Sequence, residues 1–128
     1  MGYYIGKVVK MEFDQAVNAI TSTLKEQGFG IITDIDMSAT LKKKIGKEIP
    51  PYRILGACNP KEAFDAVLLE PQVGVMLPCS VAVRQLDGLE VEISVIDPVA
   101  SMMAIENEQI KDFAENVKTK LQAAVDNL

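Results

Sequence analysis

The sequence contains no histidine. This absence excludes Ser-His-Asp and Cys-His catalysis, because both need an imidazole as general base. It also excludes the common zinc sites that use imidazole ligands. The short run Gly28-Phe29-Gly30 has too few glycines for a dinucleotide-binding fingerprint, and it follows a predicted helix where the fingerprint would open one. Any chemistry must therefore come from other side chains.

Long apolar runs are also missing. No stretch of 18 apolar residues exists, so the sequence predicts no membrane span. The first seven residues lack a charged leader followed by an apolar run, so we expect no signal peptide and a cytoplasmic protein. In a reducing compartment, Cys58 and Cys79, the two cysteines of the chain, are expected to stay free thiols. Two cysteines do not make a disulfide framework.

Positive charge is scarce relative to negative charge. Thirteen basic residues against 18 acidic residues give a formal net charge of −5, which argues against nucleic acid and against an anionic membrane surface as partners. The one cationic run, Lys42-Lys43-Lys44, is typical of a solvated helix face. The length of 128 residues and the 48% of hydrophobic residues predict a single domain over residues 1–128 with its own core.

The hydrophobic periodicity predicts a mixture of strands and helices. Apolar stripes at helical spacing occur near residues 13–27 and 107–127, and glycine or proline marks the ends of most elements. Strands are expected at 3–11, 29–35, 52–58, 79–86 and 89–96, an extended segment at 73–77, and further helices at 36–45, 60–70 and 98–105. The order β-α-β-α-β-α-β-β-α-α predicts an α+β fold with a mainly antiparallel sheet. Helices would pack on one face, leaving the other open as a possible dimer surface.

Two helix starts carry a strong capping pattern. Asn59 can cap the helix that Pro60 opens, and Glu62 can reach back to complete a capping box. Asp97-Pro98 repeats the cap-then-proline pattern. We therefore expect helix amino ends directly after two different strands.

The segment 79–96 predicts a hairpin around Asp87-Gly88, a dipeptide suited to a two-residue primed turn. Such a turn pairs residue i with residue 175 − i, which places Cys79 opposite Ile96 and Asp97 beside Pro78. Leu89, Val91, Ile93 and Val95 would form one buried face.

Strand pairing predicts that the two cysteines meet. If the strand 52–58 runs antiparallel to 79–86, Cys58 arrives at the same sheet end as Cys79 and Asp97. The positive end of the helix after Cys58 would then favour its thiolate. The alternative interpretation is that each cysteine is a small buried hydrophobic residue, as unpaired cysteine often is.

A pair of carboxylates precedes the helix at 36–45. Asp34 and Asp36 are two residues apart, so in a strand they share a face and could do acid–base work or hold a cation. The plainer interpretation is solvation of a strand end by Asp34 and helix capping by Asp36. Lys42 lies close enough along the chain to pair with either carboxylate.

Several of these segments resemble one family, the domain of unknown function numbered 302. The resemblance lies in Gly-Phe-Gly at 28–30 leading to Asp36, in Lys42, in Gly-Ala-Cys-Asn-Pro at 56–60, in Leu-Pro-Cys at 77–79, and in Asp97-Pro98. It covers essentially the whole chain. The resemblance implies a fold of the TATA-binding-protein-like class, a common homodimeric state and no established activity. Ser80 stands where the family often has asparagine, so a role that needs an amide there does not carry over.

Three functions remain open. In the first, Cys58 and Cys79 are the catalytic thiols, with Asp36 or Asp97 handling protons, Asn59 at the rim and Lys42 binding a small anionic molecule. In the second, the chain is a non-catalytic homodimeric binding module that works through its open sheet face. In the third, the two thiolates and a carboxylate form a metal site. The sequence points to no particular cofactor.

Overall fold

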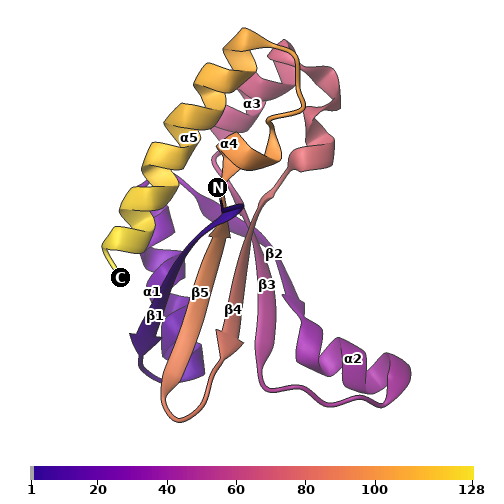
Figure 1. The fold of residues 1–128 in the computed structure, drawn as a ribbon, viewed down its shortest axis with the longest axis vertical. Helices are drawn as coiled ribbons and strands as arrows, with labels where there is room; N and C mark the ends of the chain where they lie inside the picture. Colours follow the sequence, from indigo (N-terminus) through magenta and orange to yellow (C-terminus); the bar gives the residue numbers. More distant parts are fainter. Residues whose placement is uncertain (1) are drawn as a thin grey trace.

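A five-stranded antiparallel sheet forms the centre of the computed structural model, which describes residues 2–128 (Figure 1). The strands are β1 (Tyr4–Lys10), β2 (Gly30–Asp36), β3 (Tyr52–Cys58), β4 (Cys79–Gln85) and β5 (Glu90–Ile96). The helices are α1 (Phe13–Glu26), α2 (Met37–Ile45), α3 (Pro60–Leu69), α4 (Pro98–Ser101) and α5 (Glu108–Asp126). The strand order is β1-β5-β4-β3-β2, with every neighbouring pair antiparallel. The predicted fold class is confirmed.

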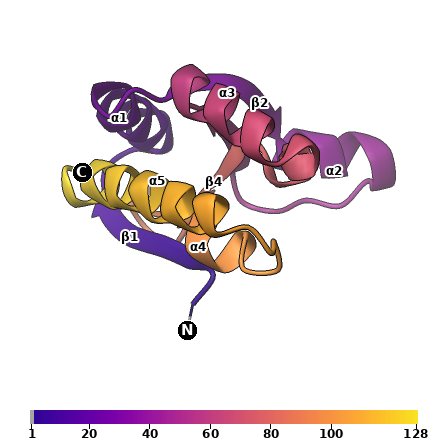
Figure 2. The ribbon, with the colours of Figure 1, turned by 90° about the horizontal axis from the view of Figure 1, so that it is seen from above.

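Helices α1 and α5 cover one face of the sheet, and α3 packs beside α5 (Figure 2). The apolar stripes that predicted the two long helices are the surfaces that meet the sheet: Ile20 and Leu24 of α1, and Ile110 and Leu121 of α5, are fully buried. The side chains of β4 and β5 that face the helices, such as Val81 and Val95, are also fully buried and form the sheet side of the core. Burial of this stripe stabilises α5 more than its intrinsic propensity does.

Helix α3 begins where the capping pattern predicts. The side chain of Asn59 accepts a hydrogen bond from the backbone N–H of Glu62 at 3.3 Å, and Pro60 takes the first helical position. The Glu62 side chain does not complete a capping box, because it forms an ion pair with Lys120 of α5 instead. This ion pair joins the first turn of α3 to α5.

Two predicted elements differ from the structure. Most of the segment predicted as extended at 73–77 forms the end of a 3-10 helix, η1 (Pro71–Met76), because Pro71 opens the turn and Val73 is buried against the core. The helix predicted at 98–105 ends at Ser101, since only its first turn is capped by Asp97. The Leu77–Pro78 peptide bond that follows η1 is cis.

The hairpin register is shifted by one residue from the prediction. The backbone N–H of Leu86 donates to the carbonyl of Glu90 at 2.8 Å, so the loop has three residues, 87–89, with Gly88 in the left-handed region at φ +65°. Val81 consequently pairs with Val95, and paired residue numbers sum to 176. Leu89 lies in this loop and is 66% exposed, whereas the sequence placed it in the buried face.

The other face of the sheet carries no helix among residues 2–128. Large apolar side chains on it or at its edges remain exposed, including Tyr4, Val8 and Ile35. The face is hollowed between β1 and β3 to a volume of about 400 Å³. None of the helices that the structure describes is long and apolar enough to cross a membrane.

Candidate functional site

Cys58 and Cys79 lie at one end of the sheet, on neighbouring strands. Ala57 of β3 pairs with Cys79 of β4, so Cys58 is one residue beyond the direct partner of Cys79. Strand geometry then puts the two Cα atoms about 6 Å apart. Because Cys79 shares its face with Ala57, the Cys58 side chain leaves β3 toward the other face, so a disulfide between the two requires movement of the backbone at the end of β3. The predicted antiparallel pairing of the two strands is confirmed, and both cysteines are free.

The two cysteines share a small, mostly apolar cavity of about 20 Å³, which has room for about one water molecule. It lies between the ends of β3 and β4, the first turn of α3 and the middle of α5. Its lining consists of Phe29, Ala57, Cys58, Asn59, Glu62, Ala63, Leu77, Pro78, Cys79, Phe113 and Val117. The space is too small to enclose a typical small-molecule ligand, which needs several hundred Å³.

The two thiols have different surroundings. Cys79 is 5% exposed, and burial raises the pKa of its thiol to about 11, with a further contribution from the neighbouring Cys58. Cys58 is half-buried at the end of β3, directly before the amino end of α3. At neutral pH the raised pKa keeps the Cys79 thiol protonated, which disfavours it as the first nucleophile. Cys58 is the thiol that a reagent can reach.

Asn59 connects the cavity to the loop before β2. It lines the cavity, and its Nδ2 atom lies 2.9 Å from the point where a Cβ of Gly28 would stand. Gly28 has φ +87°, so the αL end of α1 and the lack of a side chain both allow this close approach. The Gly28 and Asn59 segments of the sequence signature are therefore in contact.

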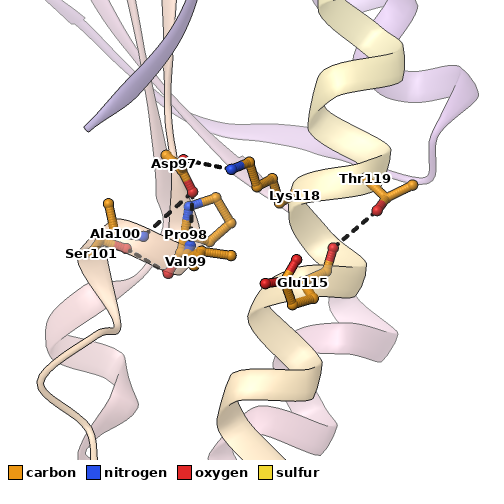
Figure 3. Close-up of polar contacts among 8 residues, drawn as sticks. All are labelled: Asp97, Pro98, Val99, Ala100, Ser101, Glu115, Lys118 and Thr119. Carbon is orange, nitrogen blue, oxygen red and sulfur yellow. Dashed lines mark hydrogen bonds and ion pairs between the residues drawn. The ribbon is translucent and has the colours of Figure 1, made fainter. Parts of the chain in front are cut away.

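Asp97 lies at the same sheet end but does not line the cavity. Its carboxylate caps α4 through the backbone N–H groups of Val99 at 2.9 Å and Ala100 at 3.4 Å, and it pairs with Lys118 of α5 at 3.0 Å (Figure 3). Burial raises the pKa of this carboxyl, but the hydrogen bonds from Lys118 and the two backbone groups outweigh burial and hold the pKa below its ordinary value. Its place in the fold is that of a buried helix cap tied to α5.

Helix α2, which Asp36 caps and which contains Lys42, lies at the opposite end of the sheet from α3 (Figure 1). Cys58 pairs with Gly30 at the start of β2, whereas Asp36 is the last residue of that strand, about 20 Å further along. Asp36 caps α2, accepting from the backbone N–H of Ala39 at 2.9 Å, and Lys42 pairs with Glu48 at 3.3 Å. The expectation that Asp36 or Lys42 would serve the thiols is therefore contradicted by their positions.

Asp34 forms an ion pair with Arg53 of β3, and Asp36 is held separately by α2. Within residues 2–128 no group of three or more Cys, Asp or Glu side chains is placed to hold a metal ion. The one carboxylate in the cysteine cavity, Glu62, is paired with Lys120. The thiolate–carboxylate site considered from sequence thus lacks its carboxylate ligands.

Sequence reasoning missed three parts of the cavity. Phe113 and Val117 belong to the apolar stripe predicted near 107–127, but nothing in their spacing shows that they face the cysteines. The Glu62–Lys120 ion pair joins residues 58 positions apart, and local pattern gives no signal for it. The position of Phe29 near Cys58 was predictable. Phe29 belongs to the Gly-Phe-Gly segment at the start of β2, and β2 pairs with β3.

Comparison with solved structures defines the class of protein first. The chain has the fold of an uncharacterized conserved DUF302 protein from Bacillus stearothermophilus, with a TM-score of 0.92 and 24% sequence identity over 99% of this chain and 98% of that chain. At this identity the likeness shows the fold alone.

The family follows from the sequence itself. A model of the domain of unknown function DUF302 matches residues 5–128, so the chain belongs to the DUF302 family. A search of the curated proteins found no match. The resemblance seen in the cysteine, glycine and proline segments is confirmed.

Proposed function

We propose that Cys58 and Cys79 form a dithiol–disulfide exchange site. The observation that carries the proposal is that an accessible cysteine and a buried cysteine line the same cavity at the amino end of a helix. This is the arrangement that an attacking thiol and a resolving thiol require: the first must meet a partner from outside, and the second must reach only the first.

The proposed reaction conserves atoms and electrons. The Cys58 thiolate attacks one sulfur of an external disulfide, whose S–S bond breaks, and the other half leaves as a thiolate that takes up a proton. Cys79 then loses its proton and attacks the Cys58 sulfur of the mixed disulfide, releasing the second thiol. The external disulfide is reduced by two electrons, and the two cysteines are oxidised to one disulfide.

Residues around the cavity support both steps. Phe113, Val117 and Pro78 exclude water from Cys79, which keeps that thiol protonated until the mixed disulfide forms. Cys58 directly precedes the Asn59-capped amino end of α3, the end of a helix at which negative charge is favoured. The small size of the cavity means that the external disulfide contacts Cys58 from the surface.

Oxidised glutathione tests this proposal on the reduced wild-type protein. We expect peptide mapping under non-reducing conditions to show a Cys58–Cys79 disulfide and release of two glutathione thiols per chain. A protein that keeps two free thiols, or that stops as a glutathione adduct, would rule out the exchange site.

A second candidate is a binding module, favoured by the open sheet face with its hollow and its exposed apolar side chains. Under this proposal Cys58→Ser and Cys79→Ser variants bind the partner as the wild type does. A homodimer, as the family resemblance implies, is part of this candidate. Sedimentation equilibrium tests it, and a monomeric mass at all protein concentrations would exclude it.

A further inference from the structure

The hollow on the open sheet face has the size of a small-molecule site. Its volume of about 400 Å³ falls in the range usual for ligand pockets. The lining comes from β1 and the residue before it, and from β3, β4 and β5: Tyr3, Tyr4, Tyr52, Ser80, Ala82, Arg84, Glu92, Ser94 and Ile96. It shares no residue with the cysteine cavity.

The hollow combines small strand residues with aromatic rings. Ser80, Ala82 and Ser94 are the short side chains of its lining. The rings of Tyr3 and Tyr4 meet edge to face, with centroids 5.0 Å apart and an angle of 67°. The Tyr4 ring lies over Gly6, where a Cβ would be 3.1 Å from its Cε2 atom. Short residues thus leave depth for a ligand, and the tyrosines offer π surfaces against which a flat ring can stack.

A cross-strand ion pair supplies the polar part of the hollow. Nε of Arg84 donates to Oε1 of Glu92 at 2.6 Å, and both side chains are partly exposed. This bond uses one of the five guanidinium N–H donors and one carboxylate oxygen, so donors and an acceptor remain side by side for a ligand. The hydrogen bond to Glu92 raises the pKa of Arg84, and the neighbouring Tyr52 and Tyr4 phenols add to this effect.

From these contacts we infer that the hollow binds a neutral, planar heteroaromatic molecule of the nucleobase or flavin-ring type. Its ring stacks on tyrosine, and its polar edge, which has both donors and acceptors, pairs with Arg84 and Glu92. The ion pair carries no net charge, so it gives an ionic ligand no net electrostatic attraction over a neutral one.

Complementarity favours such a molecule over a second copy of the chain. A second copy pressed on this face would have to supply partners for the remaining donors of the Arg84–Glu92 pair, because desolvating them unpaired is costly. A heteroaromatic edge supplies those partners. The exposed apolar side chains Val8 and Ile35 lie outside the hollow, so they do not compete for its floor.

Amide-shift mapping by NMR with uridine, adenosine and riboflavin as probes tests the inference. We expect at least one of them to shift the amides of Ala82, Arg84 and Ser94 in a saturable way, while benzoate and ribose do not. Arg84→Gln should weaken that binding about tenfold or more, because it removes charge-assisted hydrogen bonds. Arg53→Gln is the matched control, since Arg53 is the other arginine of the chain and pairs with Asp34 outside the hollow.

Several results would overturn the inference. These are no saturable shift with any of the three probes, equal binding of benzoate, or an equal loss of affinity in Arg53→Gln. Amide shifts at these positions that follow protein concentration without a probe would show a second copy as the occupant. The Cys58→Ser variant should bind the probe unchanged, so failure of the thiol proposal and failure of this inference are separate results.

Discussion

At the scale of single residues, the site depends on the difference between two cysteines. Cys79 is buried beside Cys58, and its pKa of about 11 keeps it protonated near neutrality. Cys58 is half-buried and reachable. Both side chains are thiols, so the difference in reactivity that we expect comes from their different burial.

Alkylation at different pH values measures this difference. In the reduced protein, iodoacetamide should label Cys58 first at pH 7.5, while labelling of Cys79 should rise steeply only as pH approaches about 11. Quantitative peptide mapping of both cysteines checks the order. Equal labelling of the two at pH 7.5 would show that Cys79 is neither buried nor shifted.

Gly56 is the residue of β3 whose replacement should cost most. A Cβ there would stand 2.1 Å from Oγ1 of Thr33 and 2.6 Å from Cγ of Pro78. Gly56→Ala must therefore displace the segment before Cys79, and we expect a loss of about 3 kcal/mol in the free energy of unfolding. Gly30→Ala in β2, with no atom within 4 Å of its Cβ, is the matched control and should cost far less. Urea unfolding measures the loss of unfolding free energy in each variant, and the loss should be larger for Gly56→Ala than for Gly30→Ala.

Asp97 predicts a pH-dependent contribution to stability. Its folded pKa is lowered, so its contribution is fully present above the unfolded pKa near 4 and is lost as pH falls through the folded pKa. Asp97→Asn keeps a helix cap but weakens the contact with Lys118, which should cost about 1 kcal/mol at pH 7 after allowance for solvent screening.

The difference between wild type and Asp97→Asn should therefore shrink below pH 4. Thermal unfolding at pH 7 and pH 3 measures it. Asp36→Asn is the matched control, since Asp36 caps α2 at an exposed position, and its effect at pH 7 should be smaller. A deficit for Asp97→Asn that stays constant down to pH 3 would contradict the assigned shift.

At the scale of elements, local pattern predicted most helices and strands because their apolar spacing and end signals are strong. Strand β3 and the start of α3 occur at the predicted residues. Segment 71–76 was missed because its apolar residues give no period, and only contact of Val73 with the core fixes its 3-10 turn.

The hairpin loop shows why register is harder to predict than strand existence. Asp87-Gly88 fits both a two-residue turn and a three-residue loop with glycine at the left-handed position. Leu89→Ala should change stability by less than about 0.5 kcal/mol, because Leu89 is in the loop. Val91→Ala should cost about 2 kcal/mol, because Val91 is fully buried. A cost of about 2 kcal/mol for both variants in chemical denaturation would support the two-residue turn instead, since that turn buries Leu89 and Val91 alike.

At the scale of the whole molecule, the fold places its distinctive features in separate regions. The cysteine cavity lies on the helix-covered side at one sheet end, and the tyrosine-lined hollow lies on the open face. The sequence predicts correctly that both cysteines lie at one end of the sheet, because antiparallel pairing of 52–58 with 79–86 fixes which strand ends meet. The sequence did not predict the positions of Asp36 and Lys42. Strand β2 starts beside Cys58 and ends at Asp36, so it leads Asp36 and the following helix α2 to the opposite end of the sheet.

Single-cysteine variants test most directly whether Cys58 attacks an external disulfide first and Cys79 second. After treatment of each reduced variant with oxidised glutathione at neutral pH, intact mass should show a stable glutathione adduct on Cys58 in Cys79→Ser. Cys58→Ser should stay unmodified, because its remaining thiol is buried and protonated. An adduct on Cys79 in Cys58→Ser, or none on Cys58 in Cys79→Ser, would contradict the account.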